Sequence, residues 1–424
     1  MNIRFRLMAM NFLEFFVWGA WLISFGGYMI ATLKFSGVEV GSIFATMGIA
    51  SLFMPAIMGI ISDRFVNAER VLGLCHIAGA LLLFAAAGVK DYPTLYLIML
   101  FNSMVYMPTI ALANTVSYNA LEKSGLDIVK SFPPIRVWGT VGFICAMWMV
   151  DFLGWTRSAA QLYVSAAAAL VLGIYSFTMP KRPPLKEENR SFATSIGLDA
   201  FVLFKSKKMA IFFIFSMFLG AALQITNLFG GSFLDDFKNT YPESFGVQHP
   251  NLLLSISQIS ETLFILTIPF FLKKFGIKNV MLFSILAWVL RFALFGIGNP
   301  GSGLYLLVLS MIIYGMAFDF FNISGSLFVE RESDPKIRAS AQGLFMLMTN
   351  GLGAFFGGII SGWVVDHFTT NGVRDWQNIW FSFAGYALIL ALIFPFIFDY
   401  KHPRKKDLEK ELREAVAYCK MPGS

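Results

Sequence analysis

Residues 314–330 read YGMAFDFFNISGSLFVE and place a carboxylate, Asp319, in the middle of an otherwise apolar run. An acid within a membrane-spanning helix is costly unless it faces a cavity or a partner. Tyr314 and Phe318 precede Asp319 and Asn322 follows it, so one side of the predicted helix carries an acid, an amide and aromatic rings. We interpret this side as a ligand site. The alternative is a carboxylate that neighbouring helices satisfy for packing alone.

The composition of the chain is that of a polytopic membrane protein. Of its 424 residues 57% are hydrophobic and only 14% are charged, whereas charged residues make up about 25% of soluble domains. The net charge of +7 does not indicate nucleic-acid binding, because Lys and Arg are spread over short loops between apolar runs. The three cysteines, Cys75, Cys145 and Cys419, and the four histidines share no metal-ligand spacing. We therefore expect no disulfide, no metal site and no cofactor.

Twelve apolar runs have roughly the 18 or more residues needed to cross a bilayer. They lie near 7–32, 40–62, 71–89, 93–120, 134–153, 160–179, 208–231, 252–272, 278–297, 303–329, 338–365 and 378–399. The first run lacks a small-residue cleavage site, so we expect a membrane span there rather than a signal peptide. The predicted fold class is an all-α polytopic membrane protein with twelve transmembrane helices.

Basic residues lie mainly on one side of this predicted topology. With the N-terminus inside, five of the 33 Lys and Arg residues fall in outside loops, and Arg291 falls within a span. The five are Lys34, Lys90, Arg157, Lys238 and Arg374. Because basic loops stay in the cytoplasm, we expect both termini there.

A polar stretch that begins with KRPPLKEENR at Lys181 interrupts the hydrophobic pattern. The predicted divisions are a six-helix half at 1–180, a cytoplasmic linker at 181–207, a second six-helix half at 208–400 and a charged cytoplasmic tail at 401–424. An internal repeat supports them, because residues 131–136 (SFPPIR) and 333–338 (SDPKIR) share S-x-P-x-I-R. Duplicated halves predict a site at the membrane midplane between them.

Polar and aromatic residues recur at spacings of three and four along one side of the first predicted helix. They are Asn11, Glu14, Trp18, Trp21, Phe25 and Tyr28. This side either lines the cavity or forms a tightly packed helix seam.

Glycine motifs predict places where helices approach one another closely. The second span ends in G-x-x-x-D-R, from Gly59 to Arg64, which we interpret as a hinge or gate with close packing at the glycine and a charge pair that ties the loop. Residues 353–357 and 358–362 in the eleventh span are two G-x-x-x-G motifs.

The fifth span is predicted to start at Pro133 and Pro134, since helix starts tolerate residues without amide donors. It then sets Arg136, Thr140 and Phe143 along one face. The alternative for Arg136 is a guanidinium that snorkels to the cytoplasmic surface.

Three spans of the second half carry polar pairs at i and i+3. The pairs are Gln224 with Asn227, Gln258 with Glu261, and Asp319 with Asn322. A single pair is explained by contacts between helices, whereas three pairs with two acids predict a binding site. Amides match the amide edge of a nucleobase, acids suit sugar hydroxyls, and a buried carboxyl group can load and release a proton. This chemistry fits a proton-coupled carrier of a neutral, ring-bearing, hydroxylated solute, and a sugar fits nearly as well.

Seven runs of the chain resemble the nucleoside:proton symporter family of the major facilitator superfamily. They are NFLEFFVWGAW (11–21), YMPTIALANTVSY (106–118), DIVKSFPPIRVWGTVGF (127–143), AIFFIFSMFLGAALQITNLFG (210–230), SISQISETLFILTIPFFL (255–272), YGMAFDFFNISGS (314–326) and IRASAQGLFMLMTNG (337–351). The resemblance implies a major facilitator fold, alternating access, a bacterial inner-membrane location, and uptake of purine and pyrimidine nucleosides with protons.

The resemblance also implies a set of substrate-binding residues. They are Arg136, Thr140, Phe143, Gln224, Asn227, Gln258, Glu261, Tyr314, Phe318 and Asp319. The two midspan acids of this set, Glu261 and Asp319, are the expected proton-coupling residues. Glu14 departs from the amide that the family pattern implies at its position, and it is either a further proton site or the partner of a cytoplasmic-side cation.

Other classes of function are weaker alternatives. A proton-coupled sugar or nucleobase carrier shares the fold, whereas an enzyme needs a nucleophile with a base or a metal cluster, which the sequence lacks. We expect nucleosides, protons and the lipid bilayer as partners, no nucleic acid, and a monomer.

Overall fold

The computed structural model describes residues 2–184, 198–334 and 337–400. The predicted tail at 401–424, with Cys419, lies outside these residues, as do residues 185–197 of the predicted linker. The first helices are α1 Ile3–Gly19, α2 Phe25–Ala31, α3 Gly37–Arg64, α4 Ala68–Ala87, α5 Tyr92–Lys123, α6 Ile128–Phe152 and α7 Ala160–Ser176. The next elements along the chain are the 3-10 helix η1 Leu198–Lys205, which lies inside the predicted linker, α9 Lys207–Asp236, α10 Phe245–Gln248, α11 Pro250–Ile265, α12 Ile268–Ile297 and α13 Leu304–Glu332. The last elements are α14 Arg338–Met346, the π-helix η2 Leu347–Gly353, α15 Ala354–His367, the strands β1 Thr369–Thr370 and β2 Val373–Arg374, and α16 Trp376–Ile397.

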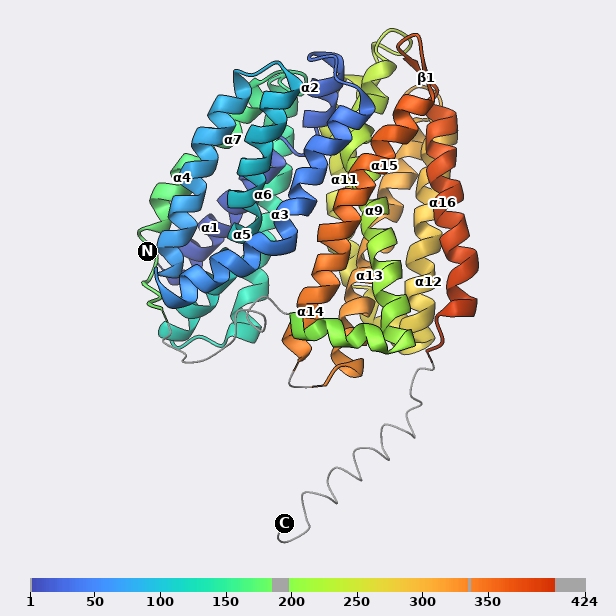
Figure 1. Cartoon of the computed structure of the whole chain (residues 1–424). Coiled ribbons are helices and arrows are strands. Elements are labelled where there is room, and N and C mark those ends of the chain that lie inside the picture. The colour runs from blue at the N-terminus through green and yellow to red at the C-terminus, as the bar shows by residue number, and fades with distance from the viewer. Residues whose placement is uncertain (1, 185–197, 335–336, 401–424) are drawn as a thin grey trace.

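The all-helical class predicted from composition is confirmed. In the described part of the chain nine helices are long and apolar enough to cross a membrane. In Figure 1 helices α1 and α3 to α7 gather on one side, and helices α9 to α16 gather on the other. Helices α3 and α15 lie side by side where the two groups meet. The two-residue strands β1 and β2 pair antiparallel in a hairpin at the same end as α2.

Side chains that cap helix starts explain several boundaries. Ser36 and Glu39 form a reciprocal capping box at the start of α3. Asp91 accepts the Thr94 amide proton at the start of α5. Hydrogen bonds from the side chain and the amide of Thr94 hold the pKa of the exposed Asp91 carboxyl below its usual value. Asp127 accepts the Lys130 amide proton in the same way. Because Asp127 caps α6, this helix starts before Pro133 and Pro134, and the predicted start at the prolines was wrong.

The first predicted span is broken rather than continuous. Between α1 and α2 the Trp21 amide donates to the Trp18 carbonyl at 3.3 Å. In a continuous helix the Trp21 amide would donate to the Val17 carbonyl. That carbonyl accepts the Ser165 hydroxyl proton of α7 instead, at 2.6 Å. The helix therefore ends where a neighbouring helix supplies a hydrogen bond that the α1 backbone would otherwise make.

The predicted eighth and ninth spans, 252–272 and 278–297, are separated by a break in the helix. α11 ends at Ile265, and residues 268–275 join the next helix across a kink at Gly276, where φ is 75°. This is the left-handed region that glycine adopts without steric cost. The turn between the two spans is therefore at Gly276.

Close approach at the G-x-x-x-G motifs is confirmed. A Cβ atom placed on Gly358 would lie 2.5 Å from the Gly41 carbonyl oxygen, and one on Gly362 would lie 2.2 Å from the Gly37 oxygen. α15 and α3 thus touch backbone to backbone. The expectation for Gly59 was wrong, since no heavy atom of the described residues lies within 4 Å of a Cβ placed there.

Candidate functional site

The acid that stands in the apolar run of α13 lies deep in the protein. Asp319 is 4% exposed, and within the described residues its Oδ2 atom has no hydrogen-bond partner. An unpaired polar oxygen in such surroundings is costly. One turn earlier, the rings of Tyr314 and Phe318 stack with centroids 5.8 Å apart and an interplanar angle of 3°. α13 therefore presents an acid and a pair of parallel rings together, as its sequence predicts.

The polar pair of α11 lies beside this face. The Gln258 side chain is within hydrogen-bonding reach of the Tyr314 hydroxyl. The charge of Glu261 interacts with that of Asp319 and with the guanidinium of Arg136 on α6. Glu261 thus connects the predicted residues of α6 with those of α13.

The predicted face of α6 turns toward other helices. The Arg136 guanidinium lies 4.0 Å from the centre of the Phe15 ring, which is cation-π geometry. Phe143, two turns further, is buried and meets Trp18 of α1 edge to face at 6.3 Å. The Arg136 guanidinium therefore packs on the Phe15 ring of α1, which argues against snorkelling. Thr140, which lies between Arg136 and Phe143 along α6, is half-buried.

Gln224 and Asn227 of α9 are half-buried. In the part of the chain that the structure describes, neither amide has a protein hydrogen-bond partner. No contact joins them directly to the acids, but Leu223 beside Gln224 lines a cavity of about 20 Å³ together with Phe318 and Asn322 of α13. That space holds about one water molecule. The charge of Glu261 interacts with those of Arg136 and Asp319, whereas no contact within the described residues joins the α9 pair to these three side chains.

Sequence reasoning missed the role of Arg291 on α12. It is 2% exposed, and its guanidinium donates to the Ser310 carbonyl at 2.9 Å and to the Thr226 hydroxyl at 3.2 Å. The guanidinium carbon lies 4.6 Å from the centre of the Tyr314 ring. Arg291 thus positions a predicted site residue. The available signal was that a basic residue stands in the middle of the predicted span 278–297.

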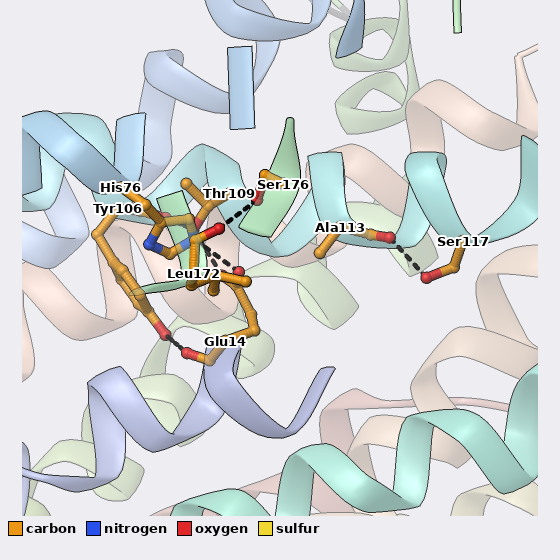
Figure 2. A network of polar contacts seen from close by, with 8 residues as sticks. All are labelled: Glu14, His76, Tyr106, Thr109, Ala113, Ser117, Leu172 and Ser176. Atoms are coloured by element: carbon orange, nitrogen blue, oxygen red, sulfur yellow. Dashed lines mark hydrogen bonds and ion pairs between the residues drawn. The ribbon is translucent and has the colours of Figure 1, made fainter. Parts of the chain in front are cut away.

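Most of the polar and aromatic stripe of the first predicted span, which covers α1 and α2, forms a packed helix seam. Asn11, Trp21, Phe25 and Tyr28 are each 5% exposed or less, which fits the packing alternative. Glu14 points into a polar network with His76 and Thr109 rather than toward a cytoplasmic-side cation, as Figure 2 shows. The pattern along the first predicted span contains no sign of this partner, because His76 lies on α4.

The comparisons with known proteins agree with the all-helical membrane fold. Residues 1–403 match the family described as "Nucleoside H+ symporter". The chain is 55% identical over 408 residues to the nucleoside permease NupG of Escherichia coli (strain K12), covering 95% of this chain and 98% of that protein. It is 56% identical over 422 residues to the xanthosine permease of the same organism, covering 99% and 100%.

Solved structures give the same answer. The crystal structure of the nucleoside transporter NupG matches with a TM-score of 0.89 at 54% identity, covering 95% of this chain and 100% of that one. A transporter of the POT family matches with a TM-score of 0.68 at 14% identity over 93% and 96% of the two chains, which shows a shared fold alone. The chain is therefore a membrane transporter rather than an enzyme, and it belongs to the nucleoside H+ symporter family.

Proposed function

We propose that this protein takes up purine and pyrimidine nucleosides together with protons across the bacterial cytoplasmic membrane. The observation that carries the proposal is that the charge of Glu261 interacts with those of both Arg136 and Asp319, three ionisable side chains on the apolar helices α11, α6 and α13. An ionisable cluster inside a membrane protein marks a substrate or ion pathway. In a chain of this family, that pathway is the one for nucleoside and proton.

The substrate site proposed here uses the residues expected from the sequence. The stacked rings of Tyr314 and Phe318 and the edge of Phe143 offer apolar faces to a base. The amides of Gln224 and Asn227, which lack protein partners in the described residues, are free to pair with the edge of that base. The remaining members of the site are Arg136, Thr140, Gln258, Glu261 and Asp319. The two acids are the proposed proton-coupling residues.

The proposed architecture has twelve spans in two six-helix halves, 1–180 and 208–400, with the linker at 181–207. The nine long apolar helices supply nine spans. The shorter helices α7 and α11 and the broken pair α1 and α2 supply the other three. The separation of α1 to α7 from α9 to α16 in Figure 1 supports the two halves.

In this conformation the proposed outside end is closed. Polar contacts cross between the two sets of helices there: Arg157 pairs with Asp235, and Asp366 of α15 accepts the amide proton of Val38 at the start of α3 at 2.8 Å. We propose that these contacts break when the transporter opens outward, and that both termini lie in the cytoplasm.

Counterflow in proteoliposomes tests the proposal. Vesicles preloaded with unlabelled uridine should accumulate labelled uridine and adenosine from outside, and excess of either nucleoside should block the exchange. Uphill uptake should stop when the proton gradient is collapsed, while exchange continues. Exchange of labelled sugars or free nucleobases in place of nucleosides would favour the alternative carrier of the same fold.

A further inference from the structure

Glu14 and His76 form a buried acid–imidazole pair inside the first set of helices (Figure 2). Glu14 Oε2 lies 2.8 Å from His76 Nε2, and the two side chains are 0% and 1% exposed. The Thr109 hydroxyl donates to Glu14 Oε1 at 2.6 Å. The Tyr106 hydroxyl donates to the Glu14 backbone carbonyl at 2.8 Å. Both carboxylate oxygens are therefore held, and the pair is closed off from water in this conformation.

The groups around the pair come from every helix packed against it. α4 contributes Cys75 beside His76, and α5 contributes Tyr106; both interact electrostatically with Glu14. α6 contributes Arg136, whose charge also interacts with Glu14. α7 contributes Ser165, which is not titratable and bonds the Val17 carbonyl. Arg136 is thus the only permanent cation near the pair within the described residues.

Arg136 joins this pair to the proposed substrate site. Its guanidinium interacts with the charges of both Glu14 and Glu261. A change of charge at one acid therefore alters the environment of the other through the same guanidinium.

A chain of ring contacts makes a second connection. The Phe143 ring meets Trp18 at 6.3 Å, Trp18 meets Tyr106 at 5.8 Å, and Tyr106 meets the His76 ring at 6.1 Å. The Trp18 Nε1 donor within this chain is buried and has no partner among the described residues. A base bound against Phe143 thus has a packed path of three contacts to His76.

We propose that Glu14 and His76 together form a second proton-binding site, whose occupancy changes as the substrate site fills and empties. Packing needs no titratable groups, whereas an imidazole changes charge in the physiological range, and ionisable residues inside a membrane are functional by default. With the proton bound, an imidazolium lies beside a carboxylate. When that proton leaves to water, a neutral imidazole remains beside the carboxylate, and the net charge of the pair falls by one. This inference rests on the proposed function.

The histidine content makes a direct test practical. The chain has four histidines, His76, His249, His367 and His402, so histidine-labelled protein gives four imidazole signals by NMR, which single His→Gln variants assign. The proposal requires the His76 signal to show both imidazolium and imidazole within the pH range in which the protein stays folded. At a constant pH inside that range, saturating uridine should change its charge state. A His76 signal that keeps one charge state at every pH, with and without uridine, would overturn the proposal.

Variants separate a proton site from a structural pair. In Glu14→Gln the amide cannot hold the charge, so the uridine-induced change at His76 should disappear. The protons exchanged with solution on uridine binding, counted with an indicator dye in weak buffer, should fall in both Glu14→Gln and His76→Gln. His367→Gln is the matched control, because His367 stacks on Trp363 at 5.4 Å and should leave both readouts unchanged. If one variant of the pair does not fold, the other decides.

The outcomes distinguish this inference from the proposed function. If the unaltered protein neither binds nor exchanges nucleosides, the proposed function fails. If it exchanges nucleosides and takes up protons, but Glu14→Gln and His76→Gln match it in proton count and in the pH profile of exchange, only the second proton site fails.

Discussion

The Asp151 carboxylate of α6 lies 2.7 Å from the Nδ1 atom of His249, just before α11 begins. The same carboxylate accepts the backbone N–H of Asn251 at 2.7 Å. Asp151 therefore ties α6 directly to the start of a helix about 100 residues later in the chain. These contacts belong to the end of the molecule that we propose to be closed to the outside.

Asp151→Ala should open this end more often. Its removal leaves the α11 amide proton without an acceptor, which costs about 1 to 3 kcal/mol. An impermeant maleimide added from outside should then label a cysteine placed at Ser255, which is buried beside Trp148, about 5- to 150-fold faster. Asp63→Ala is the control, because Asp63 pairs with Arg182 at the opposite end, which we propose to be cytoplasmic. Equal labelling rates with and without Asp151 would mean that the contact does not hold the outside end shut.

Gln224→Ala and Asn227→Ala should each weaken nucleoside binding. Loss of an amide leaves a buried polar edge of the base unpaired, which costs about 1 to 3 kcal/mol. Equilibrium binding of uridine to the purified variants measures the effect. Gln342→Ala is a matched control, because the Gln342 amide bonds Ser326 instead. Unchanged affinity in both α9 variants would remove this helix from the site.

Phe143→Ala and Phe318→Ala should lower nucleoside affinity, because each ring is expected to cover one face of the bound base. Tyrosine should be better tolerated than alanine where there is room for the hydroxyl. Phe84→Ala is the control, since the Phe84 ring packs on Tyr163 and is largely exposed. Normal transport by both alanine variants would show that the rings serve only packing.

Glu261→Gln and Asp319→Asn should abolish uphill uptake while preserving part of the nucleoside exchange. An amide keeps the size and much of the hydrogen bonding of the acid but cannot titrate, so the coupling step is lost. Uptake against a gradient and counterflow, measured side by side, separate the two effects. Glu332→Gln, which alters an acid paired with Lys208, should change neither. If both amide variants still accumulate nucleoside with a full response to the proton gradient, the coupling acid lies elsewhere, and Glu14 is next.

Gly41→Ala should disturb the packing of α3 against α15. A Cβ atom at Gly41 would lie 2.0 Å from the Gly358 carbonyl oxygen, and overpacking of this kind costs about 1 to 3 kcal/mol. Thermal unfolding in detergent should show a lower Tm and transport should slow. Gly59→Ala adds the same methyl group where no described atom is near and should be tolerated. Equal Tm values for the two variants would contradict the close contact.

The helical membrane class and the polar residues of α13 could be predicted from the residues of single segments. The length of an apolar segment and the position of an acid within it are properties of that segment alone, so the hydrophobic pattern predicts them without knowledge of the packing. Thus Asp319, Tyr314 and Phe318 lie together on one helix as the spacing predicts. The G-x-x-x-G contacts were predictable for the same reason.

Which helices these side chains contact could not be predicted from the sequence, and it became known from the packing of the helices. His76 as the partner of Glu14, Arg291 over Tyr314, and Glu261 between Arg136 and Asp319 join segments that are far apart in sequence. The break after α1 likewise depends on a hydroxyl from α7. A pattern along one helix fixes which way a side chain points, but the identity of its partner depends on how helices pack against one another, and local periodicity carries no information about that packing.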